Sequence, residues 1–70
     1  MREITIKTPF IKLDSLLKFA GLCDSGGIAK AIIQSGEVTV NGEVCLMRGK
    51  KIKNGDTVTF NGQTLKINAN

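Results

Sequence analysis

The sequence has no histidine, tryptophan or tyrosine, and it contains only two cysteines and one proline. Histidine is the side chain that most often performs general acid–base catalysis, and the six acidic residues are scattered over predicted turns and helix surfaces. Cys23 and Cys45 alone cannot supply the full set of Cys or His ligands of a structural zinc site. We therefore expect a protein that is not an enzyme and that holds no metal and no cofactor.

The sequence also lacks a recognisable signal peptide and any apolar run as long as a membrane span. Disulfides persist mainly in oxidising compartments, so we expect both thiols to be reduced and to behave as small core residues. These absences predict a cytoplasmic protein without a membrane partner or a small-molecule substrate.

Aromatic side chains are limited to Phe10, Phe19 and Phe60. Proteins that bind single strands stack bases on exposed aromatic rings, and sheet-based RNA-binding domains use paired aromatics in the same way. We interpret Phe19 as part of the margin of the core. If the chain binds a nucleic acid, the shortage of aromatics favours contacts with the backbone and the shape of a folded RNA.

The charge balance is the first positive indication of function. The chain of 70 residues carries 10 Lys and Arg against 6 Asp and Glu, a net charge of +4. Its length predicts one small domain, residues 1–70. A basic small domain suggests a polyanionic partner, although the same net charge is ordinary for solubility alone. The placement of the basic residues must therefore decide between the two interpretations.

Hydrophobic periodicity predicts a strand followed by a first helix. Charged and polar residues alternate with Ile4 and Ile6 over Arg2–Lys7, which is the pattern of a strand, and Thr8-Pro9 interrupts it. A short helix follows and ends at Gly21. The apolar stripe of this helix consists of Leu13, Leu16, Leu17 and Ala20.

The stretch from Asp24 to Gly42 begins with a second helix. Asp24 or Ser25 can cap its N-terminus, and Gly36 suits a left-handed C-terminal cap. The expected buried face of this helix consists of Ile28, Ala29, Ile32 and Ile33.

The remainder of the chain predicts two hairpins. Val38 and Val40 show strand period, and Asn41-Gly42 suits the positive φ angles of a type I′ turn. The predicted strand segments are Glu37–Val40, Glu43–Leu46, Thr57–Phe60 and Gln63–Ile67. A two-residue turn in the second hairpin places Val58 opposite Leu65. The elements predict an α+β fold, in which a helix–turn–helix-like pair packs against a small antiparallel sheet of hairpins, with one strand before the helices.

The start of the second helix is the first candidate binding site. Gly26 and Gly27 leave the free N–H groups of the helix end uncovered, and such an end attracts phosphate. Lys30 lies one turn further on, on the face of Gly26. The plainer alternative is a flexible loop that leads into a surface helix, and the charge of Asp24 competes with a phosphate.

Basic side chains gather in two parts of the sequence. One set, on the helices, consists of Lys12, Lys18 and Lys30. The other set lies in the segment Met47–Lys53 and consists of Arg48, Lys50, Lys51 and Lys53. If the sheet folds back over the helix pair, the two sets form one surface. Otherwise they are ordinary solvated charges.

Taken together, these motifs resemble the S-four RNA-binding domain, named after ribosomal small-subunit protein four. The resemblance covers residues 11–67 and includes Lys12-Leu13-Asp14 at the first helix. The other matching positions are Ser25, Ala29, Lys30, Gly36, Val38, Val40, Asn41, Gly42, Gly55 and Asp56. Lys12 stands where the family usually has Arg. Gly26 stands where many members have Arg, and here the chain is similar to the short stand-alone members.

The resemblance implies RNA binding through the helix pair, an alpha-L motif, and the adjoining strand edge, usually on rRNA or tRNA-like structure. We therefore expect non-catalytic binding of structured RNA through its phosphates, with a ribosomal subunit as a candidate partner. The expected contact residues are Lys12, Ser25, Gly26, Lys30, Arg48, Lys50 and Lys51. A protein-interaction adaptor and a DNA-binding domain are the alternatives.

Overall fold

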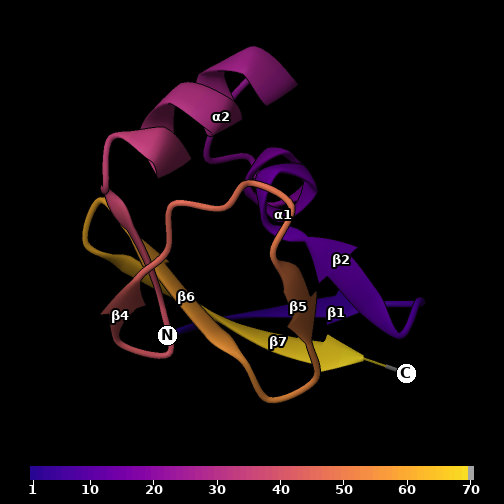
Figure 1. Ribbon diagram of the computed structural model, residues 1–70. Helices are drawn as coiled ribbons and strands as arrows, with labels where there is room; N and C mark the ends of the chain where they lie inside the picture. The colour runs from indigo at the N-terminus through magenta and orange to yellow at the C-terminus, as the bar shows by residue number, and fades with distance from the viewer. Residues whose placement is uncertain (70) are drawn as a thin grey trace.

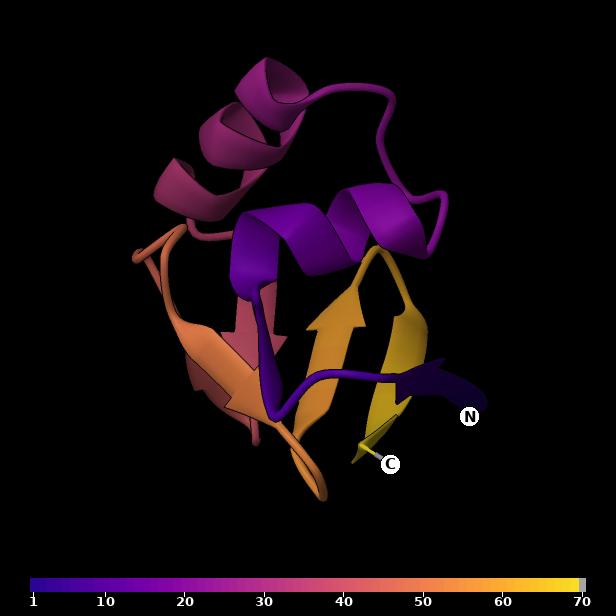
Figure 2. The same cartoon turned by 90° about the vertical axis from the view of Figure 1, so that its right-hand side faces the viewer.

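The computed structural model describes residues 1–69, which form two helices and two sheets. In chain order, the elements are β1 (Arg2–Ile6), β2 (Phe10–Lys12), α1 (Leu13–Phe19), α2 (Gly26–Gln34), β3 (Val38–Val40), β4 (Glu43–Val44), β5 (Lys51–Lys53), β6 (Thr57–Phe60) and β7 (Gln63–Ala69). α2 lies beyond α1 from the sheets (Figure 1), and α1 and β5 lie on the same side of the larger sheet (Figure 2). The predicted α+β class is confirmed.

α1 forms where the sequence predicts it, because its apolar stripe has a sheet to cover. Its buried residues are Leu13, Leu16 and Leu17, and Ala20 follows them into the core. The helix ends at Phe19 and is capped by Ala20, and the next residue, Gly21, has a φ of +77°, which favours glycine. The Arg2 Nη1 group donates a 2.7 Å hydrogen bond to the Ala20 carbonyl, which ties β1 to the end of α1.

Both predicted caps of α2 are present. Ser25 Oγ accepts a 3.2 Å hydrogen bond from the Ile28 N–H, so the serine is the N-cap. Gly36, beyond the last turn, has a φ of +85°, which is the left-handed conformation expected after a helix. The ends of α2 therefore follow directly from the local sequence.

The buried face of α2 is narrower than the sequence predicts. Ala29 and Ile33 are fully buried, whereas Ile28 is 46% exposed and Ile32 is only partly buried. The full burial expected for Ile28 and Ile32 is therefore wrong. Residues four apart lie one above the other on a helix, and the single stripe of Ala29 and Ile33 is enough to meet the core. Ile28 and Ile32 fall on the flank of that stripe.

Both predicted hairpins lie in the five-stranded sheet, whose strand order is β1-β7-β6-β3-β4. Asn41-Gly42 has φ angles of +52° and +86°, and Asn61-Gly62 has +52° and +77°, as a type I′ turn requires. Val58 pairs with Leu65, which is the predicted register. β4 is shorter than expected, because its pairing with β3 ends at Val44.

The larger sheet is mixed: the strands of the two predicted hairpins pair antiparallel, and the strand before the helices adds a parallel pair. β1 pairs with β7 in parallel, with Ile4 beside Ile67. Parallel neighbours need a long crossover, and here the crossover is the whole of the domain between the two strands. The pairing joins the two ends of the chain, a contact that no local sequence pattern can indicate.

A second, two-stranded sheet is the other difference from the prediction. β2 and β5 pair antiparallel, with Ile11 opposite Ile52, and Ile52 is fully buried. The sequence presents β5 only as part of a basic segment, because three residues are too few to display a strand period. This small sheet carries Lys12 and Lys51 side by side.

The two faces of the larger sheet have different compositions. Inward-facing Val38, Val58, Leu65 and Ile67 are fully buried in the common core with α1, α2 and Ile52. The opposite face carries threonines, and Thr59 and Thr64 share a 3.0 Å hydrogen bond there. That face lacks the paired aromatics on which sheet-based RNA-binding domains stack bases.

No helix among residues 1–69 is long and apolar enough to cross a membrane.

Candidate nucleic-acid interface

The first amides of α1 are bonded to main-chain carbonyls of the basic segment. The Leu13 N–H donates to the Lys50 carbonyl at 2.9 Å, and the Asp14 N–H donates to the Arg48 carbonyl at 3.1 Å. The Asp14 side chain in turn accepts a 2.7 Å hydrogen bond from the Ser15 N–H. The N-terminus of α1 is therefore closed to an external anion, and its amides instead hold the segment that carries the cations.

Four of the predicted contact residues meet at this end of α1. Lys12 lies opposite Lys51 in the β2·β5 pair, and the carbonyls that bind α1 fix the backbone of Arg48 and Lys50. All four side chains are exposed. We call Lys12, Arg48, Lys50 and Lys51 the basic surface. Four positive charges in one part of the surface raise the local positive potential, and this potential favours a polyanionic ligand.

Phe10 belongs to the same surface, and sequence reasoning missed it. The Lys51 ammonium lies 4.9 Å from the centre of the Phe10 ring, a cation–π contact, and Phe10 is 38% exposed. The β2·β5 pairing creates this contact, because it places Phe10 opposite Lys53 and next to Lys51. The pairing of two such short strands is not visible in the sequence.

Phe19 is 62% exposed, and its expected place at the margin of the core is wrong. The buried stripe of α1 is complete without it, and Phe19 stands in the last turn of the helix on the other side. Lys18 lies beside it, also exposed and remote from the N-terminus of α1. Phe10 and Phe19 are therefore both exposed, although the sequence predicts a place at the core margin for Phe19.

The second group of predicted contact residues lies at the start of α2 and consists of Ser25, Gly26 and Lys30. The Ser25 hydroxyl is engaged with the Ile28 N–H, and no acceptor among residues 1–69 meets the N–H of Gly26 or Gly27. A Cβ at Gly26 meets nothing within 4 Å, and the residue has no positive φ. Neither packing nor backbone conformation explains this glycine, but the open amides and the positive end of the helix suit an anion.

The two groups lie at different ends of the helix pair. α2 begins at the top of the molecule, and its other end approaches the loop after β4 (Figure 1). A Cβ at Gly36, past that other end, lies 3.9 Å from Val44. Lys12 therefore joins the basic segment as expected, whereas Ser25, Gly26 and Lys30 form a separate group at the remote end of α2.

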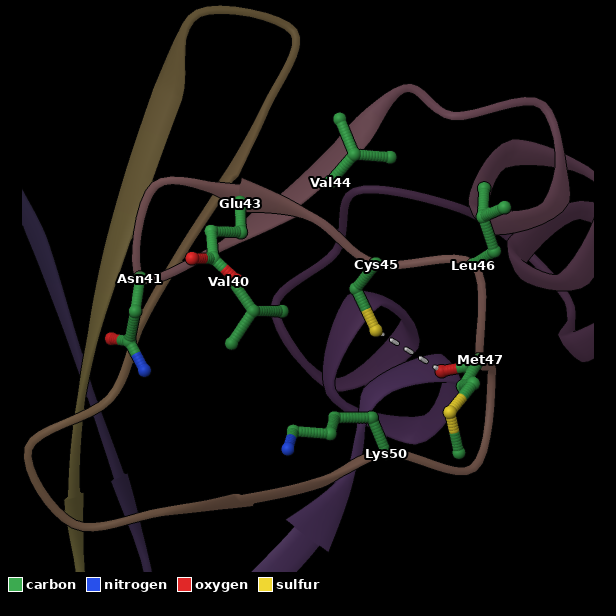
Figure 3. Close-up of a pocket in the computed structure, with 8 residues that line it drawn as sticks. All are labelled: Val40, Asn41, Glu43, Val44, Cys45, Leu46, Met47 and Lys50. Atoms are coloured by element: carbon green, nitrogen blue, oxygen red, sulfur yellow. Dashed lines mark hydrogen bonds between the residues drawn. The ribbon is translucent and has the colours of Figure 1, made fainter.

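A hollow of about 430 Å³ separates the β3–β4 hairpin from the loop that leads to β5 (Figure 3). The Lys50 side chain extends across it, and the Cys45 thiol points at the Met47 carbonyl, 3.6 Å away (Figure 3). Three apolar side chains on this side of the molecule are more than half exposed: Val44, Leu46 and Met47. The hollow therefore joins a cation of the basic surface to an apolar patch.

Asp56 organises the turn after β5, as its position in an Asn-Gly-Asp sequence predicts. Its carboxylate accepts hydrogen bonds from the Lys53 N–H at 2.9 Å and from Asn41 Nδ2 at 3.1 Å. Partial burial opposes ionisation of the Asp56 carboxyl, but these hydrogen bonds and the charges of Lys53 and Lys50 outweigh it and lower its pKa. The carboxylate thus fixes the end of β5.

Both cysteines are free thiols and are partly buried against the core. Burial, and after it the negative charge of Asp24, raise the pKa of the Cys23 thiol against the opposing effect of Lys18. A reactive cysteine needs a lowered pKa, so Cys23 lacks the usual environment of a nucleophile. Among residues 1–69, no three His, Cys, Asp or Glu side chains gather in a way that could hold a metal ion. That the thiols are reduced and without function stays a prediction.

The order of the elements and the paired helices identify the class of protein. The sequence profile of the S4 domain matches residues 4–68, so the chain belongs to the S4 domain family. The resemblance drawn from the sequence is thereby confirmed.

Among individual proteins, the chain is 40% identical over 61 residues to the putative RNA-binding protein YbcJ of Escherichia coli, and the match covers 87% of each chain. It is 42% identical over 59 residues to the probable ribosome maturation protein RlbA of Bacillus subtilis, covering 84% of this chain and 83% of the relative. Both relatives are short, as the Ser-Gly-Gly sequence at the second helix suggests.

Solved structures show the same fold. The solution structure of E. coli YbcJ, which revealed an alfaL motif involved in RNA binding, superimposes with a TM-score of 0.75 at 37% identity and covers 99% of this chain and 89% of YbcJ. The ribosomal protein S4e of Thermoplasma acidophilum superimposes with a TM-score of 0.68 at 24% identity, over 83% of this chain and 31% of that protein. The second likeness concerns the fold alone.

Proposed function

We propose that this protein binds structured RNA, of the rRNA or tRNA-like kind, through contacts with phosphates and without catalysing a reaction. The observation that carries the proposal is the basic surface, where Lys12, Arg48, Lys50 and Lys51 are gathered by the N-terminus of α1. The similarity to YbcJ and RlbA supports RNA as the polyanion and a ribosomal subunit or its precursor as the source of that RNA.

The start of α2 contributes a second set of phosphate contacts in this proposal. Ser25 and Gly26 present backbone amides, and Lys30 adds a charge one turn further on. Two separated sets of contacts span more than one phosphate group of a folded RNA. Such an arrangement recognises the shape of the backbone rather than its sequence.

The dependence of affinity on salt tests the proposal. Log affinity for a folded RNA is expected to fall linearly with log salt, and each neutralised phosphate adds about 0.7 to 0.9 to the slope. Arg48→Ala and Lys30→Ala should each reduce the slope by roughly one phosphate contact on several different RNAs. Lys66→Ala is the matched control, because Lys66 is an exposed cation on β7 that belongs to neither group.

Two results would contradict the proposal. If Lys66→Ala changes the slope as much as Arg48→Ala, binding depends on net charge and not on the basic surface. If a duplex DNA of equal length binds as tightly as the folded RNA, the chain is a general polyanion binder or a DNA-binding domain.

A protein-interaction module is the second candidate, favoured by the exposed Val44, Leu46 and Met47. In that case Arg48→Ala binds folded RNA as well as the parent protein does, and Leu46→Ser abolishes the association with a protein partner. Full RNA affinity of Leu46→Ser, together with loss in Arg48→Ala, argues for the RNA-binding function.

A further inference from the structure

A hollow beside the β2·β5 strand pair and the loop before β5 is lined by an aromatic ring together with several lysines. Its volume is about 570 Å³. The residues that matter for its chemistry are Pro9, Phe10, Met47, Lys50, Lys51 and Lys53. It thus combines an apolar floor with Lys51 and Lys53, whereas the Lys50 side chain extends across the hollow beside the β3–β4 hairpin (Figure 3).

We propose that this hollow holds one unpaired nucleotide of the RNA, with its base against the Phe10 ring and a flanking phosphate on Lys51. The inference rests on the proposed function and adds to it a ligand class, a bulged or looped-out nucleotide. It also assigns a binding role to Phe10, which phosphate contacts alone do not require.

The composition of the hollow carries the argument. A nucleotide presents a flat apolar base next to a negative phosphate, and a site for it needs an exposed π-face next to cations. Phe10 is 38% exposed, and the more exposed Met47 lies beside the same hollow. A paired base in an A-form stem cannot reach such a ring, because its face is covered by its neighbours in the stack.

Lys51 is positioned for an exchange of partners. In the free protein its ammonium lies 4.9 Å from the centre of the Phe10 ring. An exposed cation–π contact is weak, and an RNA phosphate is a stronger partner for an ammonium group. An entering nucleotide therefore takes the ring face with its base and the Lys51 ammonium with its phosphate.

Phe19 is the natural comparison, because it is the more exposed of the two rings, at 62%. The hollow beside it on α1 is lined by Ile11, Ser15 and Lys18. A second hollow beside Phe19 is lined by Lys7. Neither Lys18 nor Lys7 belongs to the basic surface, so a base on Phe19 has only one cation in each hollow next to it. Exposure alone favours Phe19 as the ring that binds the base, whereas the combination of ring and neighbouring cations favours Phe10.

Three RNA hairpins test the inference: one with a single bulged adenosine, one with an abasic nucleotide in the bulge, and one without a bulge. The abasic hairpin keeps the phosphates and the flexibility of the bulge and removes only the base. By fluorescence anisotropy, the parent protein is expected to bind the bulged adenosine about tenfold more tightly than the abasic hairpin. Phe10→Leu should lose this preference, and Phe19→Leu should keep it.

A tryptophan reporter gives a second, independent readout. The chain contains no Trp, so Phe10→Trp introduces a single indole into the hollow. Its fluorescence should be quenched by the bulged-adenosine hairpin and not by the abasic hairpin, while Phe19→Trp should respond to neither. This variant decides the matter if Phe10→Leu fails to fold.

The outcomes separate the inference from the proposed function. Equal affinity of the parent protein for all three hairpins, or quenching at Phe19→Trp instead of Phe10→Trp, overturns the nucleotide site and leaves RNA binding intact. Absence of binding to all three hairpins at low salt overturns the proposed function, and the nucleotide site with it.

Discussion

The N-termini of the two helices satisfy their free amides in opposite ways. At α1, the N–H groups of Leu13 and Asp14 donate to the carbonyls of Lys50 and Arg48. At α2, the Ser25 hydroxyl accepts a hydrogen bond from the Ile28 N–H. The N–H groups of Gly26 and Gly27 meet no acceptor among residues 1–69. One helix end is closed by the protein itself, and the other is open.

Because of this difference, the N-termini of α1 and α2 can contribute to anion binding in different ways. The amides at the closed end of α1 are occupied within the protein, and they fix the backbone of Arg48 and Lys50, two of the four residues of the basic surface. The open end of α2 offers its own amides and a partial positive charge. A helix N-terminus can therefore serve an anionic ligand either directly or by positioning cations on a neighbouring segment.

The largest expected effect is the loss of the packing that holds both helix ends in place. Ile33 is fully buried, so Ile33→Ala should reduce the free energy of unfolding by about 2 to 5 kcal/mol. Ile32→Ala is the matched control one position away and should cost clearly less, because Ile32 is only partly buried. Thermal or urea unfolding measures both variants, and equal losses would contradict the narrow buried face of α2.

The next effect concerns the open end of α2. Gly26→Asp places a carboxylate where a phosphate should meet the helix, and we expect about tenfold weaker RNA binding with unchanged or slightly higher stability. Gly26→Ala is the uncharged control, since a Cβ there meets nothing within 4 Å. RNA titrations and melting curves provide the two readouts. Parent-like affinity of a folded Gly26→Asp protein would show that only the α1 side contacts RNA.

The smallest expected effect is a loss of stability in the turn after β5, which Asp56 holds in place. Asp56→Asn removes the negative charge of the group that accepts a hydrogen bond from the Lys53 N–H. We expect the free energy of unfolding to fall by about 1 kcal/mol near neutral pH. Because the folded state lowers the pKa of Asp56 below its usual value of 3.8, the stabilisation by its carboxylate is fully present above that pH. It disappears as the pH falls through the lower, folded-state pKa.

Urea unfolding over a pH series measures this effect. The stabilities of the parent and Asp56→Asn proteins should differ at pH 7 and converge at the acid end of the series. A difference that is constant over the whole range would mean that the carboxylate charge is not what stabilises the turn.

Local sequence was sufficient wherever a structure depends on neighbours in the chain. The Ser25 cap, the left-handed Gly36 and the Asn41-Gly42 turn all follow from residue type at a single place. The register of Val58 opposite Leu65 follows in turn from the length of its hairpin loop. These features are confirmed, as is the α+β class that they imply.

Burial on the helix flanks was less predictable. Ile28 and Phe19 carry apolar side chains next to the buried stripes of α2 and α1, yet they are 46% and 62% exposed. Composition and period cannot state how wide a face the neighbouring element will cover. A small domain covers only narrow stripes, because it has little interior to offer.

The candidate site was predictable by residue type but not by arrangement. The basic residues were visible in the sequence, yet Lys12 and Lys51 become neighbours only through a pairing of three-residue strands. The same pairing brings Phe10 under Lys51 and separates this group from Gly26 at the start of α2. No periodic signal marks such short strands, so the contact between Phe10 and Lys51 was missed.

The sequence by itself determined the helix caps, the hairpin turns, the charge and the membership of the S4 domain family, because each depends on residues at fixed spacing. Only the tertiary structure decided that β1 closes the sheet in parallel with β7, that α1 has a closed N-terminus and that the cations gather around Phe10. These features join residues far apart in the chain. Their free energy comes from the burial of a shared core, and that core exists only once every element is in place.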